Sequence, residues 1–485
     1  MNRIEQYLQV IPLPVLVLGV LGAPLVFVLI PSRLRMPALL VFMVVWLTIG
    51  RLVGLGPLAA AAKATGLALY AAVGVAALMD PGPKRPVPAA AFIYPVMGVI
   101  SVAFILTVVD LALALVLRAQ WIALVFAAIA VARTVVDSAS LMRVLWALVI
   151  GMALATAIPL IPLFLNPANA FRAGLGRFEP YGAVSNQIGV LFSMTIVFGF
   201  CMMQITRNML FKLFLGGAAG AAFGMGLLTG SRSTMLTAVV PLIPQIRGLS
   251  KRPLVLVMIG LVGVLLIPFV LSKAEDTAFQ RFDSLETTRV QIFFQYLQGS
   301  IAERPLLGLT GSSGQSFLAD EEADSHAHNA YLDLAYQGGI VYLIPMLAVL
   351  AYSSYCAFYT WRYRRHVHGI DPLLVSVLVV QLGMMYAHGF VNGAIYYPTY
   401  TWAFLHVFLS VLFMGLAHDI KRGGFGIYAD SYGSQLGYDP GDDQGCDQGY
   451  DQDGDPQHDD GSDDHASSES GYGSGYVGEQ DAQRG

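Results

Sequence analysis

The stretch with the clearest chemical potential is HAHNAYLDLAYQGG, which begins at residue 326. Asp324 or Ser325 is a suitable N-cap for a short helix that would end at Gly338–Gly339, with His328 in its first turn. The positive end of a helix disfavours imidazolium, so we expect His328 to be neutral near physiological pH and able to accept a proton. The alternative is a histidine that only caps the helix or bonds a loop carbonyl.

Two further stretches, LLTGSRSTML and TTRVQIFFQYLQGSIAERPLLGLTG, contain Arg232, Arg289 and Arg304. A guanidinium stays charged and offers paired donors that match the oxygens of a phosphate group. These three residues are therefore candidates for binding an anion. Arg232 could instead snorkel from the end of a span to the interface. Arg289 and Arg304 could instead form surface ion pairs with nearby glutamates.

A fourth stretch, NPANAFRAGLGRFEPYGAVSNQ at residues 166–187, mixes basic, amide and aromatic residues. Such side chains suit sugar hydroxyls or phosphate, although an ordinary interfacial loop with an aromatic anchor has the same composition. Its polar and aromatic members are Arg172, Arg177, Tyr181, Asn186 and Gln187.

The composition indicates the class of protein that holds these residues. Of the 485 residues, 56% are hydrophobic and 12% are charged, and the mean hydropathy is +0.62. These values are typical of a polytopic membrane protein and lie outside the range of soluble domains. The three cysteines are far apart in sequence and predict neither a disulfide framework nor a metal site.

Apolar runs long enough to cross a bilayer core of about 30 Å recur along the chain. They predict an all-α fold with about 12–13 transmembrane helices. The candidate spans are 12–30, 37–54, 57–79, 89–109, 111–132, 143–165, 186–204, 209–229, 233–247, 254–272, 339–361, 373–389 and 397–416.

The connectors between these spans predict which end faces the cytoplasm. The basic connectors include GPKRPVP, RTVVDSASLMR and WRYRRHVHG, and the positive-inside rule places all of them in the cytoplasm. The outer face then receives residues 166–185, 273–328 and 389–397. Residues 273–328 form the longest connector and have an amphipathic pattern, so we expect one large extracytoplasmic loop that contains helices.

Residues 423–485 differ sharply from the rest of the chain. They hold 15 of the 32 acidic residues and one of the 28 basic residues, so this tail is near −14 and the remainder near +10. Gly, Asp, Gln and Ser dominate the tail, and such a segment cannot bury enough apolar surface to fold alone. We expect a disordered cytoplasmic tail without a calcium site, because its Asp-x-Asp fragments lack EF-hand spacing.

At this point the residues match a known pattern. His328-Asn329, followed after nine residues by Gly339-x-x-Tyr342, resembles a motif of bacterial O-antigen ligases. The block from Arg289 to the PLLG sequence at residues 305–308 resembles the outer-loop segment of the same superfamily, which includes O-antigen polymerases. The GSRS sequence around Arg232 resembles its other arginine motif. The resemblance covers about residues 131–420, and residues 1–130 share only hydropathy with the family.

The resemblance implies a GT-C-like membrane glycosyltransferase of the bacterial inner membrane, with its active site on the periplasmic face. It would transfer a glycan from undecaprenyl diphosphate to an acceptor hydroxyl on lipid A core or on a growing glycan, with inversion. No cofactor or metal is implied, and no nucleic acid is expected as a partner. His328 would be the general base, and Arg232 and Arg289 would stabilise the departing diphosphate. The candidate substrate-binding residues are Asn329, His326, Arg304, Arg177 and Tyr331.

Two alternatives to an enzyme remain. A transporter or flippase for lipid-linked sugars or another anionic substrate would use the same arginines without a hydroxyl base. Inverted repeats with broken spans in corresponding halves would favour it, and the sequence shows no convincing repeat. A structural or assembly protein would instead use the acidic tail to recruit basic partners.

Overall fold

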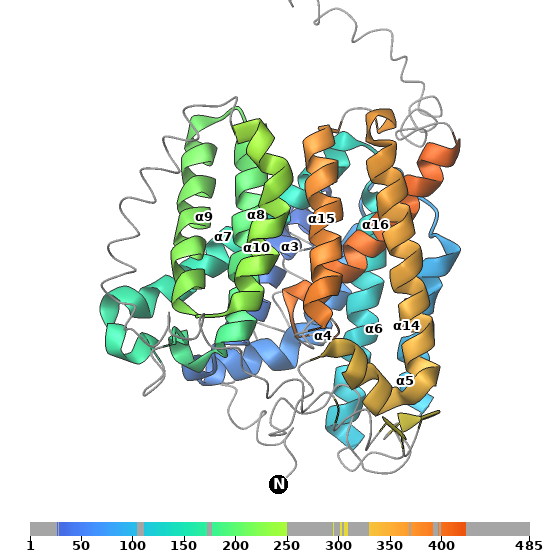
Figure 1. The fold of residues 1–485 in the computed structure, drawn as a ribbon, viewed down its shortest axis with the longest axis horizontal. Helices are drawn as coiled ribbons and strands as arrows, with labels where there is room; N and C mark the ends of the chain where they lie inside the picture. Colours follow the sequence, from blue (N-terminus) through green and yellow to red (C-terminus); the bar gives the residue numbers. More distant parts are fainter. Residues whose placement is uncertain are drawn as a thin grey trace, which may run out of the picture. The chain divides into compact units, whose positions relative to one another are not determined.

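The protein is described from a computed structural model. The residues that it describes are 27, 29–103, 111–171, 177–249, 294, 301–302, 305–308, 329–367, 370–390, 396 and 399–422, all within the unit of residues 1–436. This part of the chain is a bundle of α-helices (Figure 1). Its pairing between extended segments is limited to one antiparallel bridge between Phe171 and Phe178.

Eleven described α-helices form the bundle. Their bounds are α3 (Ser32–Ile49), α4 (Pro57–Leu78), α5 (Ile93–Ala103), α6 (Leu111–Thr134), α7 (Ser138–Leu165), α8 (Ser185–Ile205), α9 (Met209–Leu228), α10 (Arg232–Leu249), α14 (Ala330–Arg362), α15 (Pro372–Gly389) and α16 (Thr401–Arg422).

Nine helices in the described ranges are long and apolar enough to cross a membrane, and one of them is the part of α14 from Gly338 to Arg362. The predicted all-α polytopic membrane fold is therefore confirmed. Most of the predicted span 12–30 and all of the predicted span 254–272 lie outside the described residues. The predicted span 89–109 contains the short helix α5, and the predicted span 233–247 coincides with α10, an 18-residue helix that contains Pro241 and Pro244.

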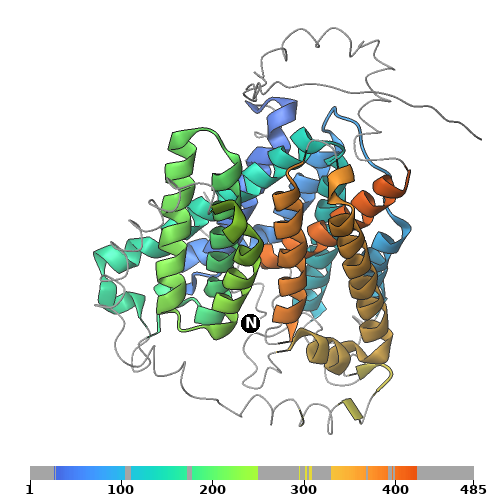
Figure 2. The ribbon, with the colours of Figure 1, turned by 45° about the horizontal axis from the view of Figure 1, so that its top comes forward.

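Helices α8 and α16 lie at the centre of the bundle. In each of them 89% of the apolar window is buried, against 39–61% in the other seven spans. A helix that is apolar on all sides suits such a position, because no face of it needs water. Helix α8 packs against α7, α9 and α10, and α16 packs against α6, α14 and α15. Figure 2 shows α16 passing obliquely behind α14 and α15.

One end of the bundle, which we call the basic end, is formed by the connectors at residues 79–88, 135–137, 206–208 and 363–371. Arg85, in the first of these connectors, is bonded to Arg133 in the last turn of α6. The Arg133 Nε–H donates to the Arg85 carbonyl at 2.9 Å, and the Arg85 N–H donates to the Arg133 carbonyl at 2.8 Å. Two of the predicted basic connectors therefore meet at the same end of the bundle.

The opposite end, which we call the loop end, is formed by residues 50–56, 166–184, 229–231, 305–308, 329 and 396–400 where they are described. It is the lower end of the bundle in Figure 1. Close packing joins its segments: a side chain at Gly54 would touch the backbone of Tyr181 at 3.0 Å. Every described candidate site residue lies at this end.

Candidate active site at the loop end

Helix α14 begins with an asparagine cap. The Asn329 Oδ1 accepts the backbone N–H groups of Tyr331 at 3.0 Å and Leu332 at 3.1 Å, and helical residues begin at Ala330. The predicted cap at Asp324 or Ser325 is therefore wrong. Asn, Asp and Ser cap helices almost equally well, so sequence alone could not rank them. His328 lies outside the described residues, and its place in the sequence is one residue before the cap rather than in the first turn.

The predicted stop at Gly338–Gly339 is confirmed as a sharp kink within α14. Gly339 has φ 62° and ψ −161°, a backbone conformation that is essentially restricted to glycine. A Cβ at this position would overlap the Leu306 carbonyl and would lie 2.6 Å from the Leu307 nitrogen. The kink separates a short opening helix, Ala330 to Gly338, from the membrane-spanning part of α14.

The PLLG turn at residues 305–308 binds directly to this kink. The Ile340 N–H donates to the Pro305 carbonyl at 2.8 Å, and the Val341 N–H donates to the Leu306 carbonyl at 3.3 Å. The kink removes the usual carbonyl partners of these two N–H groups, and the turn replaces them. The two most distinctive sequence blocks of the candidate site thus meet through their backbones.

Arg177 connects the other two loop-end segments. Its Nε–H donates to the Thr229 carbonyl at 3.1 Å, and its Nη2 donates to the Asn186 Oδ1 at 3.2 Å. Thr229 closes α9, and Arg232 is the first residue of α10 after a turn in which Gly230 has φ 60°. Arg177 therefore fixes the turn that carries Arg232 against the start of α8.

Tyr331 fastens the opening helix to α15. Its hydroxyl donates to the Tyr386 carbonyl at 2.8 Å, and its ring lies 4.6 Å from that of Phe390. Burial, and then the neighbouring Tyr386, raise the pKa of Tyr331 well above its ordinary value, so the phenol stays protonated and can keep donating. Its predicted role in substrate binding stays a prediction.

Arg51 and Arg118 are buried and were not among the sequence candidates. Arg51 follows α3, and its guanidinium lies 3.4 Å from the centre of the Tyr400 ring. Arg118 of α6 is fully buried, close enough to Tyr342 of α14 for an electrostatic interaction. Arg118 interrupts an apolar run, LALALVLRAQWIALVF, and a charge within a span is the signal that could have identified it.

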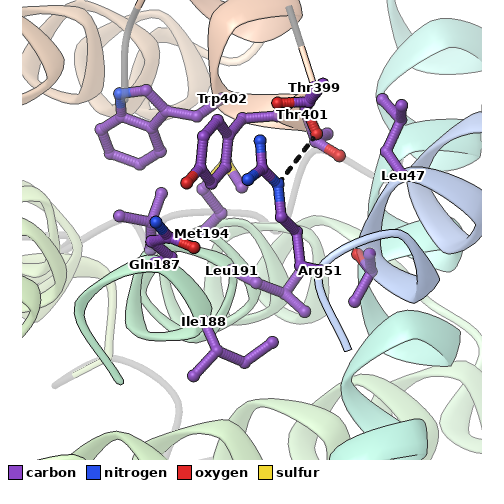
Figure 3. Close-up of a pocket in the computed structure, with 12 residues that line it drawn as sticks. Leu47, Arg51, Gln187, Ile188, Leu191, Met194, Thr399, Thr401 and Trp402 are labelled. Carbon is purple, nitrogen blue, oxygen red and sulfur yellow. Dashed lines mark hydrogen bonds between the residues drawn. The ribbon is translucent and has the colours of Figure 1, made fainter. Parts of the chain in front are cut away.

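Arg51 lines a cleft between the C-terminal end of α3, the first half of α8 and the start of α16. Its Nε–H donates to the Thr399 carbonyl at 3.3 Å. In Figure 3 the Arg51 side chain reaches toward Thr399 and Thr401, and Ile188 lies below it on the ribbon of α8. The lining of the cleft thus combines aliphatic side chains of α8 with the polar Gln187 and the cationic Arg51.

Several predicted site residues cannot be placed. His326, His328, Arg289, Arg304 and Arg172 lie outside the described residues, and the side chain of Arg232 is not described. Within the described ranges, no group of three or more His, Cys, Asp or Glu residues is arranged to hold a metal ion. The expected absence of a metal stays a prediction.

Comparison with known protein families gives a direct result. Residues 217–347 match the family model described as O-antigen ligase. The predicted family resemblance is confirmed for this segment. The O-antigen ligase segment runs from within α9 past the kink of α14, and so contains Arg232, the PLLG turn, the Asn329 cap and Gly339. Arg51, Arg118 and Arg177 lie outside it. No curated protein matches the chain.

Proposed function

We propose that this protein transfers a glycan from an undecaprenyl-diphosphate donor to an acceptor hydroxyl, as an O-antigen ligase or a polysaccharide polymerase. The observation that carries the proposal is the O-antigen ligase match over residues 217–347. The backbone contact between the PLLG turn and the kink of α14 supports it, because this contact joins two of the matched sequence blocks. The proposed catalytic domain is residues 131–420, with residues 1–130 as preceding spans and 423–485 as an appended tail.

His328 is the proposed general base. An acceptor hydroxyl is a weak nucleophile until its proton is removed, and a neutral imidazole can remove it. The Asn329 cap marks the positive end of the opening helix immediately after His328 in the sequence. This partial positive charge favours the neutral imidazole over imidazolium. His326 and Asn329 would then orient the acceptor or the base.

Arg232 and Arg289 are the proposed partners of the leaving diphosphate. As the bond between the anomeric carbon and the phosphate oxygen breaks, negative charge grows on the diphosphate, and charge-assisted hydrogen bonds stabilise it. The acceptor oxygen forms the new bond on the opposite face of the sugar, its proton passes to His328, and the anomeric configuration inverts. Arg177 supports the turn that carries Arg232, and Arg304 would contribute to donor binding.

The proposed location is the bacterial inner membrane, with the loop end on the periplasmic side and the tail in the cytoplasm. The clustering of two basic connectors at the other end of the bundle supports this orientation. The lipid-linked donor would then reach the site from the outer leaflet.

The test is transfer by the purified full chain, reconstituted with an undecaprenyl-diphosphate oligosaccharide. Lipid A core and a second lipid-linked repeat are offered as separate acceptors. Product on core alone indicates a ligase, and a ladder of longer lipid-linked chains indicates a polymerase. If neither product forms while labelled lipid changes leaflet, the proposal fails and transport replaces it. If neither product forms and no lipid moves, the proposal fails as well.

A further inference from the structure

Tyr386 of α15 is bonded through both its backbone and its side chain. Its backbone carbonyl accepts the Tyr331 hydroxyl at 2.8 Å. This carbonyl lies in the last turn of α15, where carbonyls have no partner within the helix. The Tyr386 hydroxyl lies 2.9 Å from the Ser410 Oγ of α16 and 2.5 Å from the Ser353 Oγ of α14. Tyr386 therefore links the opening helix to two membrane-spanning helices.

The two serines hold the Tyr386 hydroxyl at a fixed point. Both are fully buried, and each also bonds to its own helix. The Ser353 Oγ donates to the Leu350 carbonyl at 3.1 Å, and the Ser410 Oγ donates to the His406 carbonyl at 2.8 Å. Moving a tyrosine hydroxyl away from such partners into an apolar interior is costly. The phenol thus fixes how the end of α15 is oriented.

Aromatic packing reinforces both halves of this link. The Tyr386 ring lies 5.4 Å from the His406 ring at an interplanar angle of 80°, an edge-to-face contact. The Tyr331 ring lies 4.6 Å from that of Phe390 and 6.4 Å from that of Tyr396. The opening helix is therefore attached to α15 at a point whose own position is set by α14 and α16.

We infer that Tyr386 is a positioning residue for glycan transfer, which holds the opening helix and the proposed base His328 in the orientation that the reaction needs. His328 precedes the first residue of this helix by two positions in the sequence. Tyr386 acts through Tyr331 and needs no contact with substrate. Both Tyr386 and Ser410 lie beyond the O-antigen ligase segment, which ends at residue 347. The inference rests on the proposed function.

The first test is kcat and the donor KM of Tyr386→Phe in the reconstituted full chain. This variant keeps the ring and the backbone carbonyl and loses only the hydroxyl. We expect kcat to fall about fivefold and the donor KM to stay within about twofold, because a misplaced base slows the chemistry without weakening donor binding. Wild-type kcat in folded Tyr386→Phe would overturn the inference.

Ser410→Ala is a second variant that keeps Tyr386 intact. It removes one of the two hydroxyl partners from α16, so kcat should fall about twofold with the same donor KM. It keeps the inference testable if Tyr386→Phe fails to fold, and wild-type kcat in Ser410→Ala would then overturn it. Tyr359→Phe is the matched control, because Tyr359 lies on α14 at the basic end, with its ring 5.1 Å from the Lys421 ammonium. This control should keep the wild-type kcat.

A double variant tests whether Tyr386 acts through Tyr331. If both residues serve one link, Tyr331→Phe combined with Tyr386→Phe should lose about as much kcat as Tyr386→Phe alone. Losses that multiply would show two independent effects and would overturn the inference.

Amide hydrogen exchange of the opening helix gives a measurement that does not depend on activity. Residues Ala330 to Gln337 should exchange at least about fivefold faster in Tyr386→Phe than in the wild type, while exchange in α8 and in Tyr359→Phe stays unchanged. Equal exchange of the opening helix in Tyr386→Phe and the wild type would overturn the inference. A wild-type protein that transfers nothing would overturn the proposed function, and the exchange result would still decide the link between Tyr386 and the opening helix.

Discussion

The arginine contacts described at the two ends of the bundle differ in one respect, the presence of carboxylate partners. At the basic end, Arg85 pairs with Asp419 at 2.7 Å, and Arg143 pairs with Asp80 at 3.4 Å. At the loop end, the contacts described for Arg51 and Arg177 are with carbonyl, amide and aromatic groups. A carboxylate neutralises the charge of its partner, whereas a neutral acceptor only orients it. The ion pairs therefore contribute to the stability of the basic end, whereas the described contacts at the loop end orient Arg51 and Arg177, and the proposed function places an anionic ligand at that end.

The largest effect on stability is expected from Asp419→Asn. The Arg85 and Asp419 side chains are 3% and 1% exposed, so the variant leaves a buried guanidinium without its carboxylate. We expect a loss of about 3–5 kcal/mol, seen as a lower unfolding midpoint in detergent. Transfer per folded molecule should stay within about twofold of the wild type. Arg143→Gln is the matched control, because its longer and partly exposed pair should contribute about 1 kcal/mol or less.

Gly339→Ala should cause the largest loss of transfer among substitutions in the described residues. The new Cβ overlaps the Leu306 carbonyl and forces an unfavourable positive φ, so the PLLG turn must leave the kink. We expect transfer to fall at least tenfold, measured at saturating donor. Gly383→Ala on α15 is the control, since a Cβ there meets nothing within 4 Å and alanine favours the helix. Equal activity of the two variants would show that the kink does not position the site.

Arg177→Gln should weaken the loop end to an intermediate degree. The variant loses the hydrogen bonds to Thr229 and Asn186, so the turn before Arg232 is held less firmly. We expect about a tenfold loss of kcat/KM, equivalent to roughly 1.4 kcal/mol, with an unfolding midpoint close to that of the wild type. A fall in stability of the size expected for Asp419→Asn, without loss of transfer, would contradict the difference between the two ends.

Tyr331→Phe should have the smallest effect. It removes one hydrogen bond, to the Tyr386 carbonyl, and keeps the ring packing against Phe390. A bond of this kind contributes about 1 kcal/mol, so transfer should fall only a few-fold. A loss of a hundredfold or more would instead indicate that the Tyr331 hydroxyl touches substrate.

Hydropathy predicted most of the described helices, because crossing a bilayer is a property of each segment alone. The predicted spans 57–79 and 186–204 correspond to helices Pro57–Leu78 and Ser185–Ile205. The kink at Gly339 was also predictable, since a Gly-Gly pair ends a helix by local backbone preference. The exact cap was not, because Asp324, Ser325 and Asn329 offer similar chemistry.

The sequence alone could not predict contacts between distant segments. The bonds from Ile340 and Val341 to the PLLG turn depend on how the intervening chain returns to the kink. Arg51 belongs to a cleft only because the ends of α3, α8 and the segment before α16 converge. The sequence could have identified Arg118 as a charge within an apolar run, but it could not show that Tyr342 lies near Arg118.

The central claim is that chemistry takes place at the loop end with His328 as the base. The most direct measurement is kcat for glycan transfer by His328→Ala beside His418→Ala, with donor saturating and donor binding checked for both. His418 lies at the basic end and its side chain is 43% exposed, so its variant should keep the wild-type kcat. The account predicts a loss of about 100-fold or more for His328→Ala alone, in line with the contribution of a general base. Equal kcat values for the two variants would contradict it.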